Sequence, residues 1–334
     1  MLNYLESDYP HLNYHHTYNI VDSSKLSTYM SCPRKFFFEY LQGYRGLYPN
    51  KHLVYGTALH EAIEHILLHD LPNLDKKDRE QVFVEAFNKA LKIYRKDFPD
   101  GEFDQDRKPK SPEYILPSLV GYYQEYKSEW SSEELVATEL HGKVLVAPDR
   151  EMTYRMDAVR RNKLGQLYVL EHKTGGQAGP TWYDKWELAI QPFVYYHALR
   201  SLYPDDKFFG VVINGIIAAR RKIVTLDTIK YHRVNVRYNN QSMLDGLDTI
   251  NYHYNQLELD MVKVQDLHPT DLGMNCFHKN PNACSDYNTT CKFHGLCTMY
   301  RNPLKAEQHN HAPEGMKIER WNPLEEATNE VTVG

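Results

Sequence analysis

The stretch Val169-Leu-Glu-His-Lys-Thr174 carries two groups that could do chemistry together, the carboxylate of Glu171 and the amine of Lys173. The apolar run 167–170 predicts a strand, and side chains two apart on a strand project from the same face. Glu171 and Lys173 should therefore point the same way, with His172 pointing to the opposite face. An ordinary solvent-exposed hairpin can also carry such a pair, so the neighbouring residues must decide between the two interpretations.

A second acid lies one predicted strand upstream. Residues 152–157 indicate a strand that ends near Asp157, and the turn residues Asn162 to Gly165 would fold it onto the strand of Glu171. Two carboxylates 4 Å apart repel by about 4 kcal/mol at an effective dielectric constant of about 20. Such an arrangement predicts a divalent cation between the acids.

Five cysteines form the second group with metal chemistry. Four of them fall within 22 residues, namely Cys276, Cys284, Cys291 and Cys297, while Cys32 stands near the other end of the chain. Without an export signal, metal or cluster ligation is favoured over disulfides. Intervals of seven, six and five residues differ from the short Cys-x2–4-Cys pairs typical of zinc fingers and fit an iron–sulfur cluster better. Buried or idle thiols are the alternative.

Composition indicates a folded protein. The chain has 334 residues, 42% of them hydrophobic and 25% charged, which suits one elaborated α/β domain or two average ones. No apolar run approaches the roughly 20 residues that cross a bilayer, and residues 1–24 lack a secretion signal. We therefore expect a soluble, cytoplasmic protein with no membrane partner.

The net charge of −5 does not by itself indicate nucleic-acid binding, although an average can hide a local basic groove. The candidates for such a groove are Arg34, Lys35, Arg155, Arg160, Arg161, Arg220, Arg221 and Lys222.

The elements that must position these residues follow from apolar periodicity. Helices are predicted over 22–40, with a second helix opening at Pro33, and over 56–68, 78–95, 113–130, 184–201 and 241–262. Strands are predicted around 144–146, 152–157, 167–170, 208–217, 222–226 and 233–236. Loops are expected at 98–112 and 175–180, and the polar segment after Pro303 should be poorly ordered. His60 falls at the edge of the apolar face of its helix.

The ordered set His60, Glu139, Asp157, Glu171-His-Lys173 and Gln191-x3-Tyr195 resembles the RecB-like branch of the PD-(D/E)XK nuclease superfamily. Cys32, Pro33-Arg-Lys and the trio Cys284, Cys291 and Cys297 are similar to its iron–sulfur subgroup. That subgroup includes the AddB nuclease domain, CRISPR-associated adaptation nucleases and phage exonucleases. The resemblance covers roughly residues 23–299. It implies an α/β fold, a restriction-endonuclease-like mixed central sheet flanked by helices, with a cysteine-ligated staple joining the N- and C-terminal segments.

The resemblance also implies a domain organisation. Residues 1–22 would form an N-terminal extension, and residues 23–300 would form a single nuclease domain. Within it, Cys32 and residues 276–297 would make the iron–sulfur element. Residues 301–334 would form a polar, flexible tail.

The resemblance assigns a role to each site residue. It implies that Asp157, Glu171 and His60 bind Mg²⁺ or Mn²⁺, and hard oxygen ligands with one imidazole suit those ions. Lys173 would orient the attacking water or stabilise the pentacovalent transition state. Gln191 and Tyr195 would position the DNA backbone or Lys173, and Glu139 would be a supporting acid, with His141 as a rival. Cys32, Cys284, Cys291 and Cys297 would hold a 4Fe-4S cluster, whereas Cys276 is surplus or replaces Cys284.

The function that the resemblance implies is a metal-dependent DNA exonuclease on single-stranded or free-ended DNA, acting in recombination, repair or phage DNA processing in a bacterial or phage-type host. The chain has no Gly-x4-Gly-Lys-Ser/Thr motif, so unwinding would need a helicase partner. A CRISPR-adaptation processing nuclease would share every site residue. A non-catalytic DNA-binding scaffold with a zinc site is the alternative outside the enzymes.

Two positions depart from the family pattern. Tyr154 stands where glycine is frequent, three residues before the motif Asp157, so the approach of substrate there differs. His172 stands where an apolar or aromatic residue is usual. Because its face of the strand should be buried, we predict a hydrogen-bonded core histidine.

Overall fold

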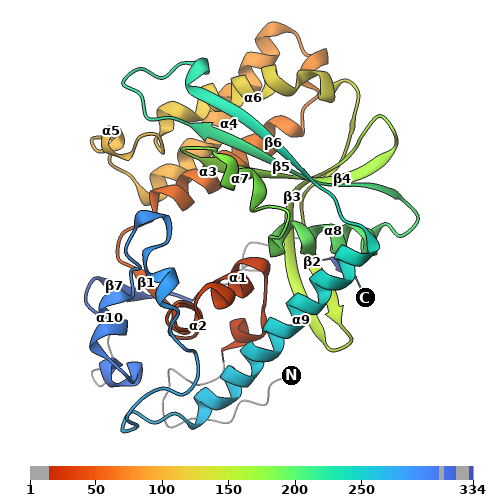
Figure 1. The fold of residues 1–334 in the computed structure, drawn as a ribbon. Helices are drawn as coiled ribbons and strands as arrows, with labels where there is room; N and C mark the ends of the chain where they lie inside the picture. Colours follow the sequence, from red (N-terminus) through yellow and green to blue (C-terminus); the bar gives the residue numbers. More distant parts are fainter. Residues whose placement is uncertain (1–14, 308–311, 321–330, 334) are drawn as a thin grey trace.

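The structure, a computed structural model, describes residues 15–307, 312–320 and 331–333 (Figure 1). In that part of the chain a six-stranded mixed sheet has the order β6-β5-β4-β3-β2-β8. β4 pairs with β5 and β2 with β8 in parallel, and the other neighbours are antiparallel. The sheet strands are β2 (Glu134–Ala147), β3 (Arg150–Arg161), β4 (Gln166–Gly175), β5 (Lys207–Ala218), β6 (Ile229–Val236) and β8 (Val331–Val333). The fold class expected from the sequence, a mixed central sheet flanked by helices, is confirmed.

Helices cover both faces of this sheet (Figure 1). On one face α3, α4 and α6 pack over Tyr168 and Leu170, and on the other α1, α8 and α9 pack over Leu167 and Val169. This alternation along β4 is the period of two that a strand buried on both faces requires. The α-helices are α1 (Ser23–Ser31), α2 (Pro33–Phe36), α3 (Lys51–Leu67), α4 (Lys76–Asp97), α5 (Asp104–Arg107), α6 (Ile115–Trp130), α7 (Pro180–Asp184), α8 (Ile190–Leu202), α9 (Asn240–Lys263) and α10 (His294–Met299).

A third apolar cluster joins the two ends of the chain. Phe36, Phe37 and Phe38 pack with Phe277 and Phe293, with Phe36 stacked on Phe277 at 5.9 Å between ring centroids. Beside it, β1 (Tyr44–Gly46) pairs with β7 (Met316–Ile318) in a small antiparallel sheet. The segments around Cys32 and around residues 276–297 therefore share one packed core.

The helix predicted over 184–201 is wrong in its first turns. Residues 180–184 form α7, turns follow, and α8 begins only at Ile190. Pro192 explains the boundary, because proline lacks an amide hydrogen and is tolerated only in the first turn of a helix. Leu188, which the longer helix would carry, is 92% exposed.

The strand predicted over 222–226 is also wrong. Residues 220–225 are irregular and Ile223 is exposed, whereas β6 begins at Ile229 and pairs with β5. Side chain and backbone hydrogen bonds between Thr225 and Thr228 close the connection. An apolar residue without a sheet neighbour gains nothing from an extended conformation.

Parts of the predicted N-terminal extension and C-terminal tail lie within the described residues. Within 15–22, Val21 O accepts a hydrogen bond from Thr153 N at 2.8 Å, so this part packs on the sheet; residues 1–14 lie outside the described residues. Within 301–334, the described parts include β7 and β8. The 98–112 loop contains the short helix α5. None of the helices in the described part of the chain combines the length and the apolar character that a membrane span requires.

Candidate active site

The site lies where β3 and β4 stop pairing. Their ladder runs from Arg161 opposite Leu167 to Ala158 opposite Leu170. One residue beyond it, Asp157 Oδ2 accepts a hydrogen bond from the backbone amide of His172 at 2.6 Å. The sequence predicted that Asp157 ends its strand; instead β3 continues to Arg161, and Asp157 marks the end of its pairing with β4.

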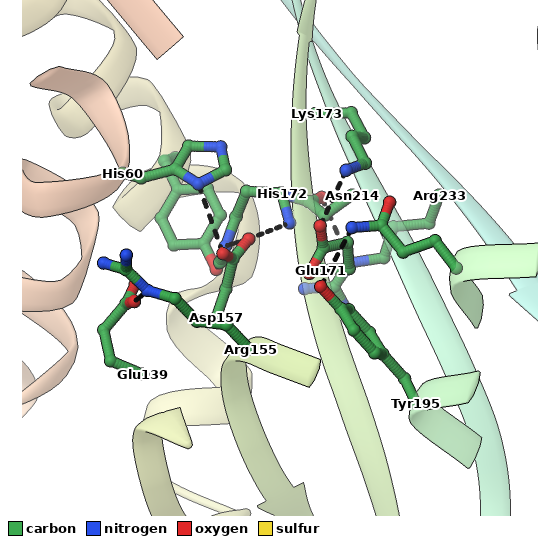
Figure 2. Close-up of polar contacts among 12 residues, drawn as sticks. His60, Glu139, Arg155, Asp157, Glu171, His172, Lys173, Tyr195, Asn214 and Arg233 are labelled. Carbon is green, nitrogen blue, oxygen red and sulfur yellow. Dashed lines mark hydrogen bonds and ion pairs between the residues drawn. The ribbon is translucent and has the colours of Figure 1, made fainter. Parts of the chain in front are cut away.

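Glu171 and Lys173 lie on one face of β4, as the period of two predicted (Figure 2). Lys173 Nζ donates a 2.7 Å hydrogen bond to Glu171 Oε1. The Glu171 side chain is 3% exposed, and its Oε2 has no hydrogen-bond partner among the described residues. Burial and the charge of Asp157 raise the pKa of Glu171 to about 7. The carboxylates of Asp157 and Glu171 are therefore close enough for their charges to interact.

His60 approaches the same acid from helix α3. Its Nδ1 lies 3.2 Å from Asp157 Oδ1. Burial alone would lower the pKa of His60, but the Asp157 charge and this contact raise it overall. Burial likewise opposes ionisation of Asp157, yet the charge of His60 and hydrogen bonds from His172 and His60 hold its pKa well below the usual value. The structure thus places His60 beside Asp157.

His172 points away from Lys173 into the core between the sheet and α6. It is 1% exposed, and its Nδ1 lies 3.4 Å from Asp157 Oδ2 while its Nε2 lies 3.0 Å from Tyr122 Oη. The prediction of a hydrogen-bonded core histidine is confirmed. Sequence reasoning missed Tyr122, although its helical spacing from Leu119 and Tyr126 marks it as inward-facing.

Gln191 and Tyr195 bond each other on α8. Gln191 Nε2 donates to Tyr195 Oη at 2.9 Å, and Tyr195 points toward Glu171 (Figure 2). Burial and the charges of Glu171 and Asp157 hold the pKa of Tyr195 well above its ordinary value. The Tyr195 hydroxyl is therefore a neutral hydrogen-bonding group on the Glu171 side of the site.

Glu139 lies at the edge of this group on β2, in a left-handed backbone conformation with φ +46°. Its carboxylate forms an ion pair with Arg155 (Figure 2). Burial and the nearby charge of Asp157 raise the pKa of Glu139. His141 Nδ1 bonds the Glu139 carbonyl oxygen at 2.9 Å. Arg155 therefore neutralises the acid that the sequence offered as a supporting group.

The cysteines that the resemblance selected line one cavity. Cys32, Cys284, Cys291 and Cys297 surround a volume of about 230 Å³, together with Lys35 and Lys279. Asn280 holds the two segments together, since its Nδ2 donates to Ser31 O at 2.7 Å and its amide donates to Cys32 Sγ at 3.4 Å. Cys276 is fully buried in the third apolar cluster and does not line the cavity, and burial raises its pKa to about 12.

The basic residues proposed as a groove do not form one continuous surface. Arg34 and Arg160 are buried, and Arg160 pairs with Glu129. Arg161 pairs with Asp206 at 2.5 Å. Arg220, Arg221 and Lys222 are exposed in the connection between β5 and β6. A basic surface near the site would therefore have to use this connection rather than the whole predicted set.

Over the described ranges, no three His, Cys, Asp or Glu side chains are already spaced to hold one metal ion. In the site, His60 contacts Asp157 and Lys173 contacts Glu171 directly. Asp157 Oδ1 and Glu171 Oε1 thus contact protein groups, and the role of His60, Asp157 and Glu171 as metal ligands stays a prediction.

Residues 23–298 match the family described as PD-(D/E)XK nuclease superfamily. No curated protein matches the chain. Among solved structures, the chain is similar to one titled "Crystal structure of SSO0001", with a TM-score of 0.27 and 15% sequence identity. That match covers 62% of this chain and 86% of the other chain. The family match spans His60, the E-x-K strand, the Gln191-Tyr195 helix and the cysteines.

Proposed function

Because the chain belongs to the PD-(D/E)XK nuclease superfamily, we propose that it is a metal-dependent nuclease that hydrolyses phosphodiester bonds in DNA. The environment of Glu171 carries this proposal. Its Oε2 is buried and has no partner in the described part of the chain, and the charge of Asp157 lies close enough to raise its pKa. A buried carboxylate with a free oxygen beside the half-buried carboxylate of Asp157 is a strong ligand set for a divalent cation.

The donor atoms fit Mg²⁺ or Mn²⁺ in kind. Asp157 and Glu171 offer hard oxygen ligands, and His60 offers an imidazole nitrogen, which favours Mn²⁺ somewhat. A divalent ion in such a site polarises a phosphate oxygen and activates a water molecule. The contact of His60 with Asp157 would open when the ion binds, whereas Lys173 would keep its contact with Glu171 Oε1 and leave Oε2 for the ion.

Lys173 supplies the positive charge for the transition state. Its ammonium group is fixed by Glu171 Oε1 and lies 5.8 Å from the centroid of the Trp186 ring. Its side chain is 26% exposed, so a phosphate can reach it. A fixed cation beside the phosphate stabilises the charge that develops during attack. Tyr195, held by Gln191, offers a hydroxyl group toward the Glu171 side of the same site.

Digestion of end-labelled DNA tests the proposal. Wild-type protein should degrade DNA only with Mg²⁺ or Mn²⁺, and Glu171→Gln should abolish cleavage because it removes a ligand charge. Glu187→Gln is the matched control, since Glu187 is exposed in the turn after α7. Equal cleavage by wild type and Glu171→Gln would refute the assigned site.

The preferred substrate that we propose is single-stranded or free-ended DNA, attacked from an end in recombination, repair or phage DNA processing. The RecB-like order of His60, Asp157, Glu171-x-Lys173 and Gln191-x3-Tyr195 supports this choice. Linear and circular single strands of equal sequence distinguish cleavage from an end from cleavage within the strand. An exonuclease degrades only the linear strand, and cleavage of both at equal rates would contradict exonuclease action. Added helicase should extend degradation to long duplexes.

We also propose that the cysteine cavity holds a 4Fe-4S cluster as a structural staple. Cys32, Cys284, Cys291 and Cys297 line one cavity of about 230 Å³, and a 4Fe-4S cluster takes four cysteine thiolates. This favours a larger group over zinc, whose four ligands crowd around one centre at about 2.3 Å.

The surroundings of the cavity carry the positive charge that a thiolate-ligated cluster needs. Lys35 and Lys279 line it. The buried guanidinium of Arg34 lies near Cys32 and Cys297, and its Nη1 has no hydrogen-bond partner among the described residues. Iron and sulfide analysis with visible absorption tests the proposal; one zinc ion per chain without iron would refute it.

A further inference from the structure

His172 is a polar residue at a position where packing does not require one. Its neighbours on the same face of β4, Leu170 and Tyr168, belong to the apolar core under α3 and α6. His172 is 1% exposed, and a buried imidazole costs free energy unless both of its nitrogens are bonded. Both have a polar partner here: Nε2 forms a hydrogen bond with Tyr122, and Nδ1 faces the Asp157 carboxylate at 3.4 Å. The polar group therefore connects the core to the acid of the site.

The partners of the ring determine its tautomer. The ionised Asp157 carboxylate can only accept, so His172 Nδ1, 3.4 Å from Oδ2, must carry the proton. In a neutral ring Nε2 is then an acceptor, and Tyr122 donates its hydroxyl hydrogen to it over 3.0 Å. Tyr122 Oη in turn lies beside the guanidinium of Arg233. The Tyr122 hydroxyl therefore donates to His172, and the His172 ring directs its own N–H toward Asp157.

The backbone amide and the ring of His172 converge on a single oxygen of Asp157. The backbone amide of His172 donates to Oδ2 at 2.6 Å, and the ring approaches the same oxygen. The other oxygen, Oδ1, remains on the side of His60. We propose that His172, held by Tyr122, is a positioning residue that fixes the Asp157 carboxylate and thereby sets the affinity of the site for its divalent cation. This inference rests on the proposed metal-dependent function.

Three substitutions at His172 separate this role from core packing. Asparagine places an amide nitrogen where Nδ1 stands, glutamine places one near Nε2, and leucine places none. All three substitutions remove the imidazole ring. If His172 has only a structural role, each should therefore reduce Mn²⁺ affinity to a similar extent. The positioning role predicts that only His172→Asn keeps the donor to Asp157.

The readout is the dissociation constant of Mn²⁺ for the full chain, measured by electron paramagnetic resonance, with thermal unfolding in parallel. Partners of metal ligands change metal affinity by about 10–100-fold, so we expect such losses for His172→Leu and His172→Gln but only about threefold for His172→Asn. Equal affinities in the Asn and Leu variants would overturn the inference. Failure of wild-type protein to bind Mn²⁺ would instead overturn the proposed function.

A second measurement does not depend on whether the His172 variants fold. Nitrogen chemical shifts of ¹⁵N-histidine-labelled wild-type protein report which ring nitrogen carries hydrogen. We expect a neutral ring protonated at Nδ1 whose signals shift in Tyr122→Phe, where the hydroxyl donor to Nε2 is removed. A His172 ring protonated at Nε2 would contradict the proposed direction of the hydrogen bonds.

Discussion

Lys173 Nζ donates to Glu171 Oε1 over 2.7 Å, while the other oxygen of the same carboxylate is buried without a partner among the described residues. The two oxygens of Glu171 therefore have different surroundings. The first holds the lysine in place, and the second is available to a cation. This division follows from their spacing, because residues two apart on a strand share a face.

Replacing Lys173 with methionine should remove cleavage without removing the site. The loss of one fixed charge beside the phosphate costs about 10²–10³-fold in rate. Asp157, Glu171 and His60 remain, so Mn²⁺ should still bind. Single-turnover cleavage and Mn²⁺ titration measure the two effects separately. Lys163→Met, in the exposed turn between β3 and β4, is the control and should cleave like wild type.

Cys32 and Cys276 should respond differently to alanine substitution. Cys32 and the trio are more than 250 residues apart, so a shared cluster closes most of the chain and its loss favours the unfolded state. Cys32→Ala or Cys291→Ala should lower iron content, solubility and thermal stability. Cys276→Ala should keep its iron, because Cys276 does not line the cavity. Full iron and unchanged unfolding in Cys32→Ala would contradict the staple.

Lys110 should make stability increase with pH. It is 2% exposed, its Nζ has no hydrogen-bond partner in the described ranges, and burial lowers its pKa to about 8. The unfolded chain, with a lysine pKa near 10.5, binds more protons between these values. Below pH 8 the buried, charged Lys110 lowers the free energy of unfolding by about 3 kcal/mol. This destabilisation should diminish as pH rises toward 10.

Urea unfolding at pH 7 to 10 measures this effect. Lys110→Met, which keeps the aliphatic stem over the Tyr55 ring, should be more stable than wild type at pH 7, with the difference shrinking at pH 10. A constant difference across this range would show that Lys110 does not titrate in it.

Gly215 should not tolerate a side chain. It pairs with Lys173 across β4 and β5, and a Cβ there would lie 2.5 Å from the ring of Trp182 in α7. Gly215→Ala should move α7 off the sheet and destabilise the protein by about 1–3 kcal/mol. Gly176→Ala is the matched control, because nothing lies within 4 Å of its Cβ position. Urea midpoints compare the two, and equal midpoints would contradict the close contact.

Local periodicity was sufficient to predict much of the site. The alternation along β4 put Glu171 with Lys173 and turned His172 inward, and helical spacing put His60 on a core-facing helix. The turn predicted at Asn162 to Gly165 is present as well, and Gly165 adopts φ +73° there. Each of these features depends on residues that lie close together in the chain. The sequence therefore determines which way these side chains face.

Contacts between distant elements were decided only by the tertiary structure. Tyr122 reaches His172 from 50 residues away, and Arg155 pairs with Glu139 across β2 and β3. Arg34 and Arg160, predicted as groove residues, are buried, and Phe277 O and Glu129 accept their hydrogen bonds there. Burial and partners depend on how layers stack, and a residue's neighbours in sequence do not carry that information.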